Sequence, residues 1–298
     1  MSTDQYACLP NGMHVCYRAR GNPSDEALLL ISGLAEDLTC WPPVFLDGLV
    51  ERGFYVIHYD NRDVGRSTTM RTPPPSTLRQ LLGRARSDAY TLTDMAADGA
   101  GLLDHLEIDR AHVVGRSMGG MIAQTFAATH RVRIRTLTSI YATTGQPSAG
   151  QPTWSTRIRV IASRPPRTWQ EAVQRHLTIT SRIAGSAYPL DDSWEKQYAK
   201  GAWDRSCGAG QAGVARQIQA IQASGDRTGQ LRTITAPTLV IHGDKDPMVN
   251  ITGGYATAHA IQGARLVVIP GMGHHFAPGL LGRLLNLITQ HGREGVPM

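Results

Sequence analysis

Short runs of apolar and often β-branched residues recur along the chain and alternate with longer amphipathic stretches. The runs ALLLIS, FYVIHY and PTLVIH are apolar almost throughout, which is typical of parallel strands buried on both faces. The predicted strands cover residues 14–18, 27–32, 54–59, 111–115, 136–141, 237–242 and 265–270.

Between these runs, apolar residues recur at the spacing of one helical face. The predicted helices cover residues 43–52, 93–106, 118–130 and 279–290, and Thr93 is expected to cap the second of them. Strands that alternate with helices in this way predict an α/β fold with a doubly wound, mostly parallel sheet.

The alternation stops between residues 144 and 230, where no convincing buried strand is found. This region has Pro- and Gly-rich joints and helical stretches at residues 169–180 and 213–223. We therefore expect a core made of residues 1–143 and 231–298, with residues 144–230 inserted as a helical cap over one edge of the sheet.

The composition, with 41% hydrophobic and 18% charged residues among 298, is ordinary for a soluble globular enzyme. The net charge of +6 raises the question of a nucleic-acid or membrane partner. However, the basic residues are scattered, and all but Lys196, Lys200 and Lys245 are arginines. We therefore expect no nucleic-acid partner and no stable membrane association.

The cysteines show neither a CxxC pair nor metal-ligand spacing; they are Cys8, Cys16, Cys40 and Cys207. The N-terminal residues lack the apolar segment of a signal peptide, and no apolar run approaches the roughly 18 residues that span a bilayer. A reduced, cytoplasmic protein without a metal or another cofactor is the simplest interpretation.

The strongest chemical signal is Gly115-Arg116-Ser117-Met118-Gly119, a G-x-S-x-G pattern between a predicted strand and a predicted helix. The flanking glycines allow a sharp turn that projects the serine hydroxyl from the end of a sheet. The N–H of Met118, at the start of the helix, would then be free to stabilise an oxyanion. The alternative is a glycine-flanked turn whose serine only caps the helix.

A serine hydroxyl becomes a good nucleophile when a base takes its proton, so an orienting acid and a histidine are expected after Ser117. Two aspartates follow the strand 237–242, at the sheet edge where reacting groups collect. We favour Asp246, which lies further past the strand and is fixed by Pro247, and we expect Asp244 to stabilise the turn.

The base is expected in the loop after the last predicted strand, which reads Gly271-Met272-Gly273-His274-His275. The glycines let this loop bend an imidazole back over the sheet edge. We favour His274, which follows them directly, and His275 is the alternative.

A second oxyanion donor is expected in the loop after strand 27–32, where Gly33 would permit the N–H of Leu34 to face the site. Trp41 belongs to the core or to the wall of a substrate pocket. The remaining candidates for substrate contact are Gly33, Arg116, Trp154, Trp194 and Trp203. Packing between the cap helices explains the three tryptophans equally well.

Several of these segments resemble the α/β-hydrolase superfamily. L-L-L-I-S-G, continuing to Trp41, is similar to its L-L-H-G…W segment, with Ser32 in place of the usual histidine. Y-D-N-R-D-V-G-R-S-T-T is similar to its D-x-R-G-x-G-x-S turn, with Asp63 at the usual glycine position. With I-P-G-M-G-H, they resemble the esterase, haloperoxidase-like and methylesterase branch, in particular the aclacinomycin methylesterases of polyketide biosynthesis.

The resemblance covers about residues 5–143 and 233–292. It implies an α/β-hydrolase fold, a triad of Ser117, Asp246 and His274, and oxyanion donors at Leu34 and Met118. The replacement of the usual histidine by Ser32 leaves the backbone role of Leu34 intact and removes a side chain that supports the loop in the family.

Residues and resemblance together predict a serine carboxylesterase that acts on a small or medium apolar ester through an acyl-enzyme. Alternatives with the same triad are a methylesterase for an aromatic polyketide, a lactonase, a C–C bond hydrolase and a cofactor-free perhydrolase. Ser117 excludes a haloalkane dehalogenase, which uses an aspartate nucleophile. A non-catalytic ligand-binding receptor on the same fold is the alternative from another functional class.

Overall fold

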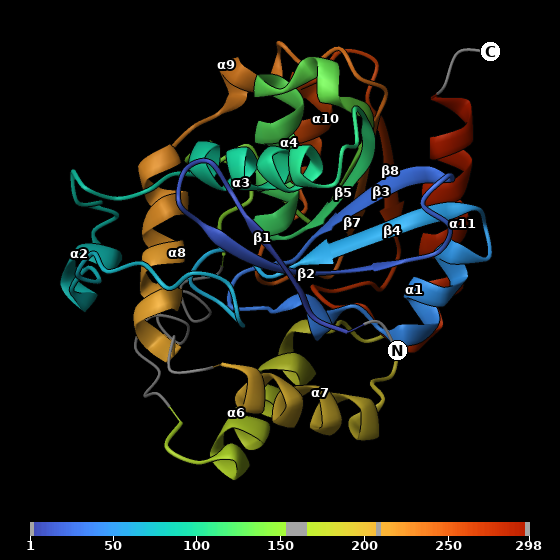
Figure 1. The fold of residues 1–298 in the computed structure, drawn as a ribbon. Coiled ribbons are helices and arrows are strands. Elements are labelled where there is room, and N and C mark those ends of the chain that lie inside the picture. Colours follow the sequence, from blue (N-terminus) through green and yellow to red (C-terminus); the bar gives the residue numbers. More distant parts are fainter. Residues whose placement is uncertain (1–2, 153–165, 207–209, 296–298) are drawn as a thin grey trace.

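The computed structural model describes residues 3–152, 166–206 and 210–295, and an eight-stranded sheet forms its centre (Figure 1). The strand order across the sheet is β1-β2-β4-β3-β5-β6-β7-β8. The strands are β1 Gln5–Cys8, β2 His14–Arg20, β3 Glu26–Ile31, β4 Phe54–Tyr59, β5 Ala111–Arg116, β6 Ile134–Ile140, β7 Thr238–Gly243 and β8 Arg265–Ile269. Each predicted strand is present, and the predicted fold class is confirmed.

The pattern of the sequence does not predict β1, which forms one edge of the sheet. Only Ala7 of its four residues is buried, so the strand carries little hydrophobic signal. β1 pairs antiparallel with β2 and β2 pairs antiparallel with β4, whereas every pair from β4 to β8 is parallel. The parallel part brings the carboxyl ends of its strands to one edge of the sheet.

Helices cover both faces of this sheet (Figure 1). α1 Pro43–Val50 and α11 Pro278–Glu294 pack together on one face, where they contact β4 and β6. On the opposite face lie α3 Leu92–His105, α4 Met118–Thr129 and α10 Thr252–Ala260. The shorter helices are α2 Thr77–Leu81, α9 Thr228–Leu231 and the 3-10 turns η1 Leu38–Cys40 and η2 Arg131–Arg133.

Strand β3 shows how the sheet divides the core into two apolar clusters. Leu28 and Leu30 face the cluster beneath α1 and α11, whereas Leu29 and Ile31 face the cluster beneath α3 and α4. All four side chains are fully buried. Burial of each contributes about 1.5–3 kcal/mol relative to exposure, which explains why the strand is apolar on both faces.

The N-terminus of α3 corrects one prediction. The capping residue is Thr91, not Thr93, because Thr91 and Asp94 form a reciprocal capping box. The Thr91 hydroxyl accepts a hydrogen bond from the Asp94 N–H, and the Asp94 carboxylate accepts one from the Thr91 N–H at 2.7 Å. Thr93 is followed three residues later by Ala96, which cannot return such a bond.

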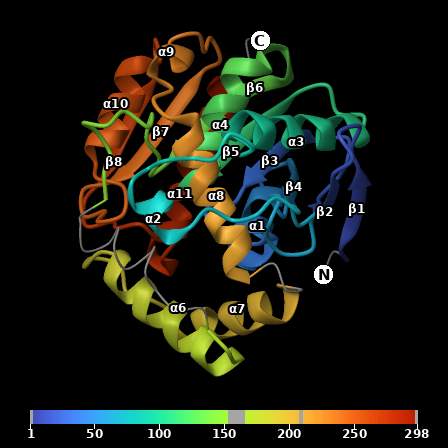
Figure 2. The ribbon, with the colours of Figure 1, turned by 90° about the vertical axis from the view of Figure 1, so that its left-hand side faces the viewer.

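Between β6 and β7 the chain forms α6 Trp169–Ile183, α7 Asp192–Arg205 and α8 Gly210–Ser224. α6 and α7 pack against each other below the sheet, whereas α8 runs beside α2 and α3 (Figure 1, Figure 2). The predicted helices 169–180 and 213–223 fall within α6 and α8, and α7 was not predicted. The assignment of residues 144–230 to a separate cap unit stays a prediction.

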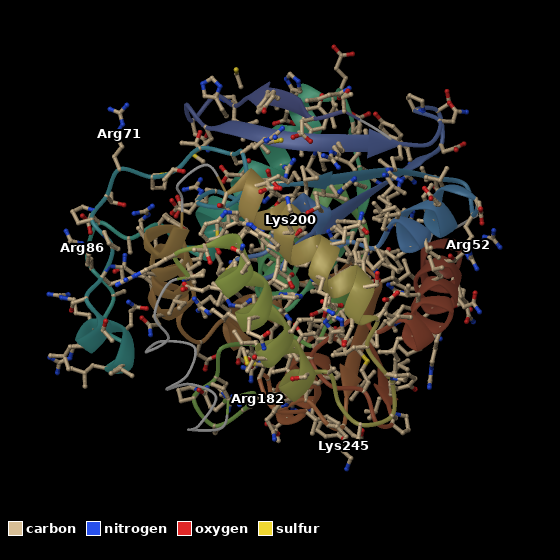
Figure 3. All side chains as sticks on the ribbon, turned by 90° about the horizontal axis from the view of Figure 1, so that it is seen from below. Arg52, Arg71, Arg86, Arg182, Lys200 and Lys245 are labelled. Carbon is tan, nitrogen blue, oxygen red and sulfur yellow. The ribbon has the colours of Figure 1, made fainter. Side chains whose placement is uncertain are left out.

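Basic side chains are spread over the surface. In the view from below, the labelled cations lie at separate places around the molecule; they are Arg52, Arg71, Arg86, Arg182, Lys200 and Lys245 (Figure 3). Within the described ranges, no helix combines the length and the apolar character needed to cross a bilayer.

Candidate active site

Ser117 lies in the turn between β5 and α4, with φ of 55° and ψ of −124°. A positive φ is rare for a residue that carries a side chain, and such strain costs about 1–3 kcal/mol. The Ser117 N–H donates to the Ile140 carbonyl at 2.9 Å, and the Met121 N–H donates to the Ser117 carbonyl at 3.1 Å. The strained turn is therefore anchored to both β6 and α4.

Both glycines of the G-x-S-x-G pattern are required by the close approach of backbone segments. A Cβ at Gly115 would overlap with the Gly119 carbonyl, and a Cβ at Gly119 would overlap with the Ile31 carbonyl of β3. Any side chain at either position would push the turn away from the sheet. The sequence pattern therefore reflects packing around Ser117.

His274 lies in the loop between β8 and α11, and the C-terminal end of α6 supports this loop. The Gly273 N–H donates to the Ala184 carbonyl at 3.0 Å, and the His274 N–H donates to the Ile183 carbonyl. A Cβ at Gly273 would overlap with the Ile183 carbonyl, so glycine is needed for this approach. Helix α6, which lies between β6 and β7 in the chain, thus fixes the backbone of the predicted base.

The structure brings Ser117, His274 and Asp246 into one chain of hydrogen bonds. His274 Nε2 lies 2.8 Å from Ser117 Oγ, and His274 Nδ1 lies 2.7 Å from Asp246 Oδ2. Because a carboxylate only accepts hydrogen bonds, the proton of the neutral imidazole belongs on Nδ1. Nε2 then has a free lone pair that accepts the serine hydroxyl proton.

Asp246 is buried and held in one orientation by the backbone after β7. Its Oδ1 accepts hydrogen bonds from the N–H groups of Met248 and Val249, both at 2.8 Å, which leaves Oδ2 for His274. His242 Nε2 lies 2.8 Å from the Val249 carbonyl and 3.7 Å from Asp246 Oδ2. Burial lowers the pKa of His242, so the neutral form of this imidazole is favoured.

Tyr141, which follows β6, packs against the imidazole of His274 and was not singled out from the sequence. The two ring centroids are 4.3 Å apart and the planes meet at 47°. Tyr141 is buried and has a φ of 37°. The packed ring restricts rotation of the His274 side chain away from Ser117.

Asp244 and His275, the alternative candidates for the acid and the base, lie away from Ser117. Asp244 Oδ1 accepts a hydrogen bond from the Gly271 N–H at 2.6 Å and so ties the loop after β7 to the loop after β8. His275 Nε2 lies 2.8 Å from the buried carboxylate of Glu195 on α7. Neither Asp244 nor His275 contacts the side chain of Ser117 in the described part of the chain.

The two predicted oxyanion donors belong to two segments next to Ser117, the start of α4 and the loop after β3. Met118 opens α4, where a first-turn N–H has no acceptor within the helix. In the loop after β3, Gly33 is so near Ser117 that a Cβ on it would lie 3.3 Å from the serine Cβ. Among the described residues, no acceptor contacts the N–H of Leu34 or of Met118.

Arg116, a predicted substrate contact, points into the protein and pairs with Glu36. Arg116 Nε donates to Glu36 Oε2 at 2.8 Å, and Arg116 Nη2 contacts Glu36 Oε1. Burial alone would raise the pKa of Glu36, but the Arg116 guanidinium outweighs burial and lowers it. The ionised Glu36 also accepts the Gly33 N–H at 2.8 Å. The sequence offered one signal for Glu36, its position three residues after Gly33.

The tryptophans differ in their surroundings. Trp41 is 1% exposed and packs against Phe45 and Phe276, with the Arg116 guanidinium 5.2 Å from its ring. Trp194 stacks on Tyr198 within α7. Trp203 is half-buried on the same helix, and Trp154 lies outside the described residues. Substrate contact by these tryptophans, by Arg116 and by Gly33 stays a prediction.

Within the described ranges, no group of three or more histidine, cysteine, aspartate or glutamate side chains is arranged to hold a metal ion. Cys8, Cys16 and Cys40 are free thiols, and Cys207 lies outside the described residues. The candidate site itself presents a serine hydroxyl, an imidazole and a carboxylate in one chain of hydrogen bonds.

The sequence and the structure of this chain are similar to those of known hydrolases. The family model described as alpha/beta hydrolase fold matches residues 26–277. Rhodomycin D methylesterase of Streptomyces peucetius is 30% identical over 302 residues, covering 92% of this chain and 93% of that protein. 3-Oxoadipate enol-lactonase 2 of Acinetobacter baylyi is 26% identical over 257 residues, covering 85% and 84%. Among solved structures, the enol-lactonase from Burkholderia xenovorans superimposes with a TM-score of 0.73 at 25% identity, covering 96% and 99%.

Proposed function

Because the chain belongs to the alpha/beta hydrolase fold family, we propose that it is a serine carboxylesterase that hydrolyses a small or medium apolar ester. The observation that carries the proposal is the hydrogen-bonded chain from Ser117 Oγ through His274 to Asp246, with links of 2.8 and 2.7 Å. These distances lie within the reach required for proton transfer. Esterase and lactonase relatives support hydrolysis of a carboxylic ester bond.

In the first step, His274 Nε2 takes the proton of the Ser117 hydroxyl while Oγ attacks the ester carbonyl carbon. Asp246 stabilises the imidazolium that forms, since its Oδ2 faces Nδ1. The carbonyl oxygen becomes an oxyanion, and the N–H groups of Leu34 and Met118 are the donors proposed to stabilise it. His274 then protonates the departing alcohol, which leaves an acyl group on Ser117.

In the second step, water attacks the acyl-enzyme. His274 takes a proton from the water, the same N–H groups stabilise the second oxyanion, and the acid leaves when the proton returns to Ser117. Every group in this cycle is carried by the chain itself, so the proposal requires no cofactor.

Methyl ester hydrolysis on an aromatic polyketide is the second candidate, and the 30% identical rhodomycin D methylesterase supports it. Both candidates use the same residues and differ only in the acyl and alcohol groups that the pocket admits. A panel of p-nitrophenyl esters of increasing acyl length, an aromatic polyketide methyl ester and an enol-lactone separates them. The preferred substrate is the one with the highest kcat/KM.

Ser117→Ala tests the mechanism directly. We expect kcat to fall by about 10⁴-fold or more, because the variant loses the nucleophile while the buried turn remains folded. A fluorophosphonate probe should label the wild type on the peptide that contains Ser117 and leave the variant unlabelled. Ser181→Ala, which removes an exposed hydroxyl on α6, is the control and should behave as the wild type.

Two results would reject the proposal. Unchanged turnover in Ser117→Ala would exclude Ser117 as the nucleophile. A wild-type protein that binds esters but neither turns them over nor reacts with the fluorophosphonate would be a ligand-binding receptor on this fold. The expected cytoplasmic location and the absence of nucleic-acid and stable membrane partners stay predictions.

A further inference from the structure

Three consecutive N–H groups in the loop after β3 differ in their partners. The Gly33 N–H donates to Glu36 Oε2 at 2.8 Å, and the Ala35 N–H donates to Gln217 Oε1 at 2.9 Å. Among the described residues, the Leu34 N–H between them has no acceptor. We call residues 32–36 the oxyanion loop. Side chains occupy the two flanking N–H groups of this loop, so only the central one remains available to a substrate.

Gln217 comes from α8, 182 positions further along the chain than Ala35. Its side chain is fully buried, and both ends of the amide are used, because Nε2 donates to the Arg62 carbonyl at 2.9 Å. The amide therefore bridges the oxyanion loop and the turn that follows β4. A bridge fixed at both ends holds its oxygen at one place beside Ala35.

The first half of α8 is docked firmly on the turn after β4. Arg216 makes two contacts with Asp63, Nε to Oδ2 at 2.9 Å and Nη2 to Oδ1 at 2.6 Å. A Cβ at Gly213 would overlap with the Asp63 carbonyl, so the helix backbone lies directly on the turn. Gln217 is consequently presented to the oxyanion loop from a rigid support.

The oxyanion loop needs such a support. Ala35 has a φ of 62°, a left-handed conformation that alanine adopts only when its surroundings hold it. Ser32 stands where the resembling family carries a histidine, and its hydroxyl is an acceptor for Cys40 Sγ at 3.4 Å. Within the part of the chain that the structure describes, the bond from Ala35 to Gln217 is the hydrogen bond that reaches the strained residue from outside the loop.

We propose that Gln217 is a positioning residue for the oxyanion loop: by holding the Ala35 N–H it keeps the Leu34 N–H free and in place for the transition state. The inference rests on the proposed function and deepens it. The inserted region then contributes to the chemical step through α8.

Gln217→Met tests this inference, because methionine keeps the length of the side chain and removes both the acceptor for Ala35 and the donor to Arg62. With p-nitrophenyl butyrate, we expect kcat to fall about 10- to 100-fold, as for a displaced oxyanion donor, while KM changes about threefold or less. Binding of an aryl trifluoromethyl ketone, whose adduct with Ser117 carries an oxyanion, should weaken by a similar factor. The pH dependence of kcat/KM should keep its shape, since the bonds of His274 are untouched.

Two further variants separate positioning from simple stability. Gln219→Met makes the same change on the same helix at a buried glutamine whose Oε1 accepts the Arg86 N–H at 3.2 Å, remote from the oxyanion loop. It should lose comparable thermal stability and keep wild-type kcat. Gln217→Glu keeps an oxygen acceptor for the Ala35 N–H and should recover kcat toward the wild-type value, whatever its stability.

Wild-type kcat in Gln217→Met would overturn the inference, and so would a kcat in Gln217→Glu as low as in the methionine variant. Equal loss of kcat in Gln217→Met and Gln219→Met would also overturn it, because the cause would then be general loosening of α8. These results leave the proposed function standing, since Ser117→Ala tests that separately. A wild-type protein without hydrolytic activity would reject the proposed function and this inference together.

Discussion

The sheet and the helices α6 and α7 are held in the molecule by different kinds of contact. On the sheet, α4 is buried at every residue from Met118 to Ala128, mostly by apolar side chains. On α7, by contrast, the buried residues are Glu195, Ala199 and Arg205. The sheet is stabilised by the area it buries, whereas α7 is fixed by two buried charges with specific partners.

The partners of Arg205 and Glu195 show how this attachment works. Arg205 reaches three carboxylates of the core, Asp4 at 2.6 Å, Asp37 at 3.1 Å and Asp60 at 2.7 Å. Glu195 lies 2.6 Å from His176 on α6 and 2.8 Å from His275 beside the predicted base. Apolar burial tolerates many neighbours, whereas a buried charge is costly unless its specific partner lies beside it. The difference predicts cooperative loss of the sheet and local loosening of α7.

Phe126→Ala should have the largest effect on stability. Phe126 is fully buried on α4 and packs near Gly99 of α3, so truncation leaves a cavity in the core. We expect the free energy of unfolding to fall by about 3–5 kcal/mol. Urea unfolding followed by circular dichroism and by esterase activity should give coincident transitions. Val132→Ala, at a site 71% exposed, is the control and should stay within about 0.5 kcal/mol.

Arg205→Met should cost about 3 kcal/mol, because it leaves the buried carboxylates of Asp37 and Asp60 without their cation. Asp4 keeps its pairs with Arg18 and Arg66. Hydrogen exchange should accelerate in α6 and α7 and change little in β3 and β5. Burial raises the pKa of Asp60 to about 6 although Arg205 opposes this rise. The variant should therefore regain part of its free energy of unfolding when Asp60 takes up a proton. The deficit should therefore be larger at pH 8 than at pH 5.

The control for Arg205→Met is Lys200→Ala on the same helix, where Lys200 faces the viewer in Figure 3. Its pair with Asp204, at 2.8 Å, is exposed on both sides and should contribute less than about 0.5 kcal/mol. Equal acceleration of exchange throughout the sheet in Arg205→Met would show that α7 and the sheet unfold as one unit. The two regions would then not differ in how they are held.

Glu195→Gln should have the smallest of the three effects, because glutamine still offers an oxygen to His176 and His275. The depressed pKa of Glu195 sets an upper limit of about 3 kcal/mol at pH 7, and we expect a smaller loss. Burial alone would raise the pKa of Glu195, but His176 and His275 outweigh it and lower the pKa from 4.5 to about 2. A carboxyl group with a depressed pKa stabilises the fold fully above pH 4.5 and loses this effect as the pH falls toward 2. The difference between variant and wild type in urea unfolding should therefore shrink between pH 5 and pH 3.5.

Glu51→Gln, an exposed change at the end of α1, is the control and should show a difference within about 0.5 kcal/mol at each pH. A deficit in Glu195→Gln that is the same at every pH would mean that the cluster contributes through packing alone. In that case the two buried charges of α7 would not act in the same way.

The same contrast explains what could be predicted from the sequence. Strands such as β3 and β4 were predicted nearly to the residue, because burial on both faces demands an unbroken apolar run. The turn at Ser117 was predicted because packing excludes side chains at Gly115 and Gly119, and that exclusion is visible as a motif. Requirements for burial and close packing act on residues that are near one another in the sequence, so they produce a recognisable sequence pattern.

Features that depend on distant partners left no such signature. α7 was missed because its buried positions carry Glu195 and Arg205, which give no apolar stripe. α10 was missed because Gly253 and Gly254 weaken the helical pattern. Gln217 and Ala35 are 182 positions apart and come into contact only in the folded chain, and no sequence pattern near either residue predicts this hydrogen bond.

The path of the chain between β6 and β7 limits how this protein can be re-engineered. These strands are neighbours and run parallel, so the chain that leaves the end of one must travel back along the sheet to enter the other. A return of this kind requires a dozen or more residues, and α8 and α9 lie on that route. A shortened chain must therefore keep α8 and α9, and it must also keep the end of α6, whose carbonyls hold the backbone of Gly273 and His274. Replacing everything between β6 and β7 by the matching segment of a relative would also replace α8 and α9, which return the chain to the start of β7.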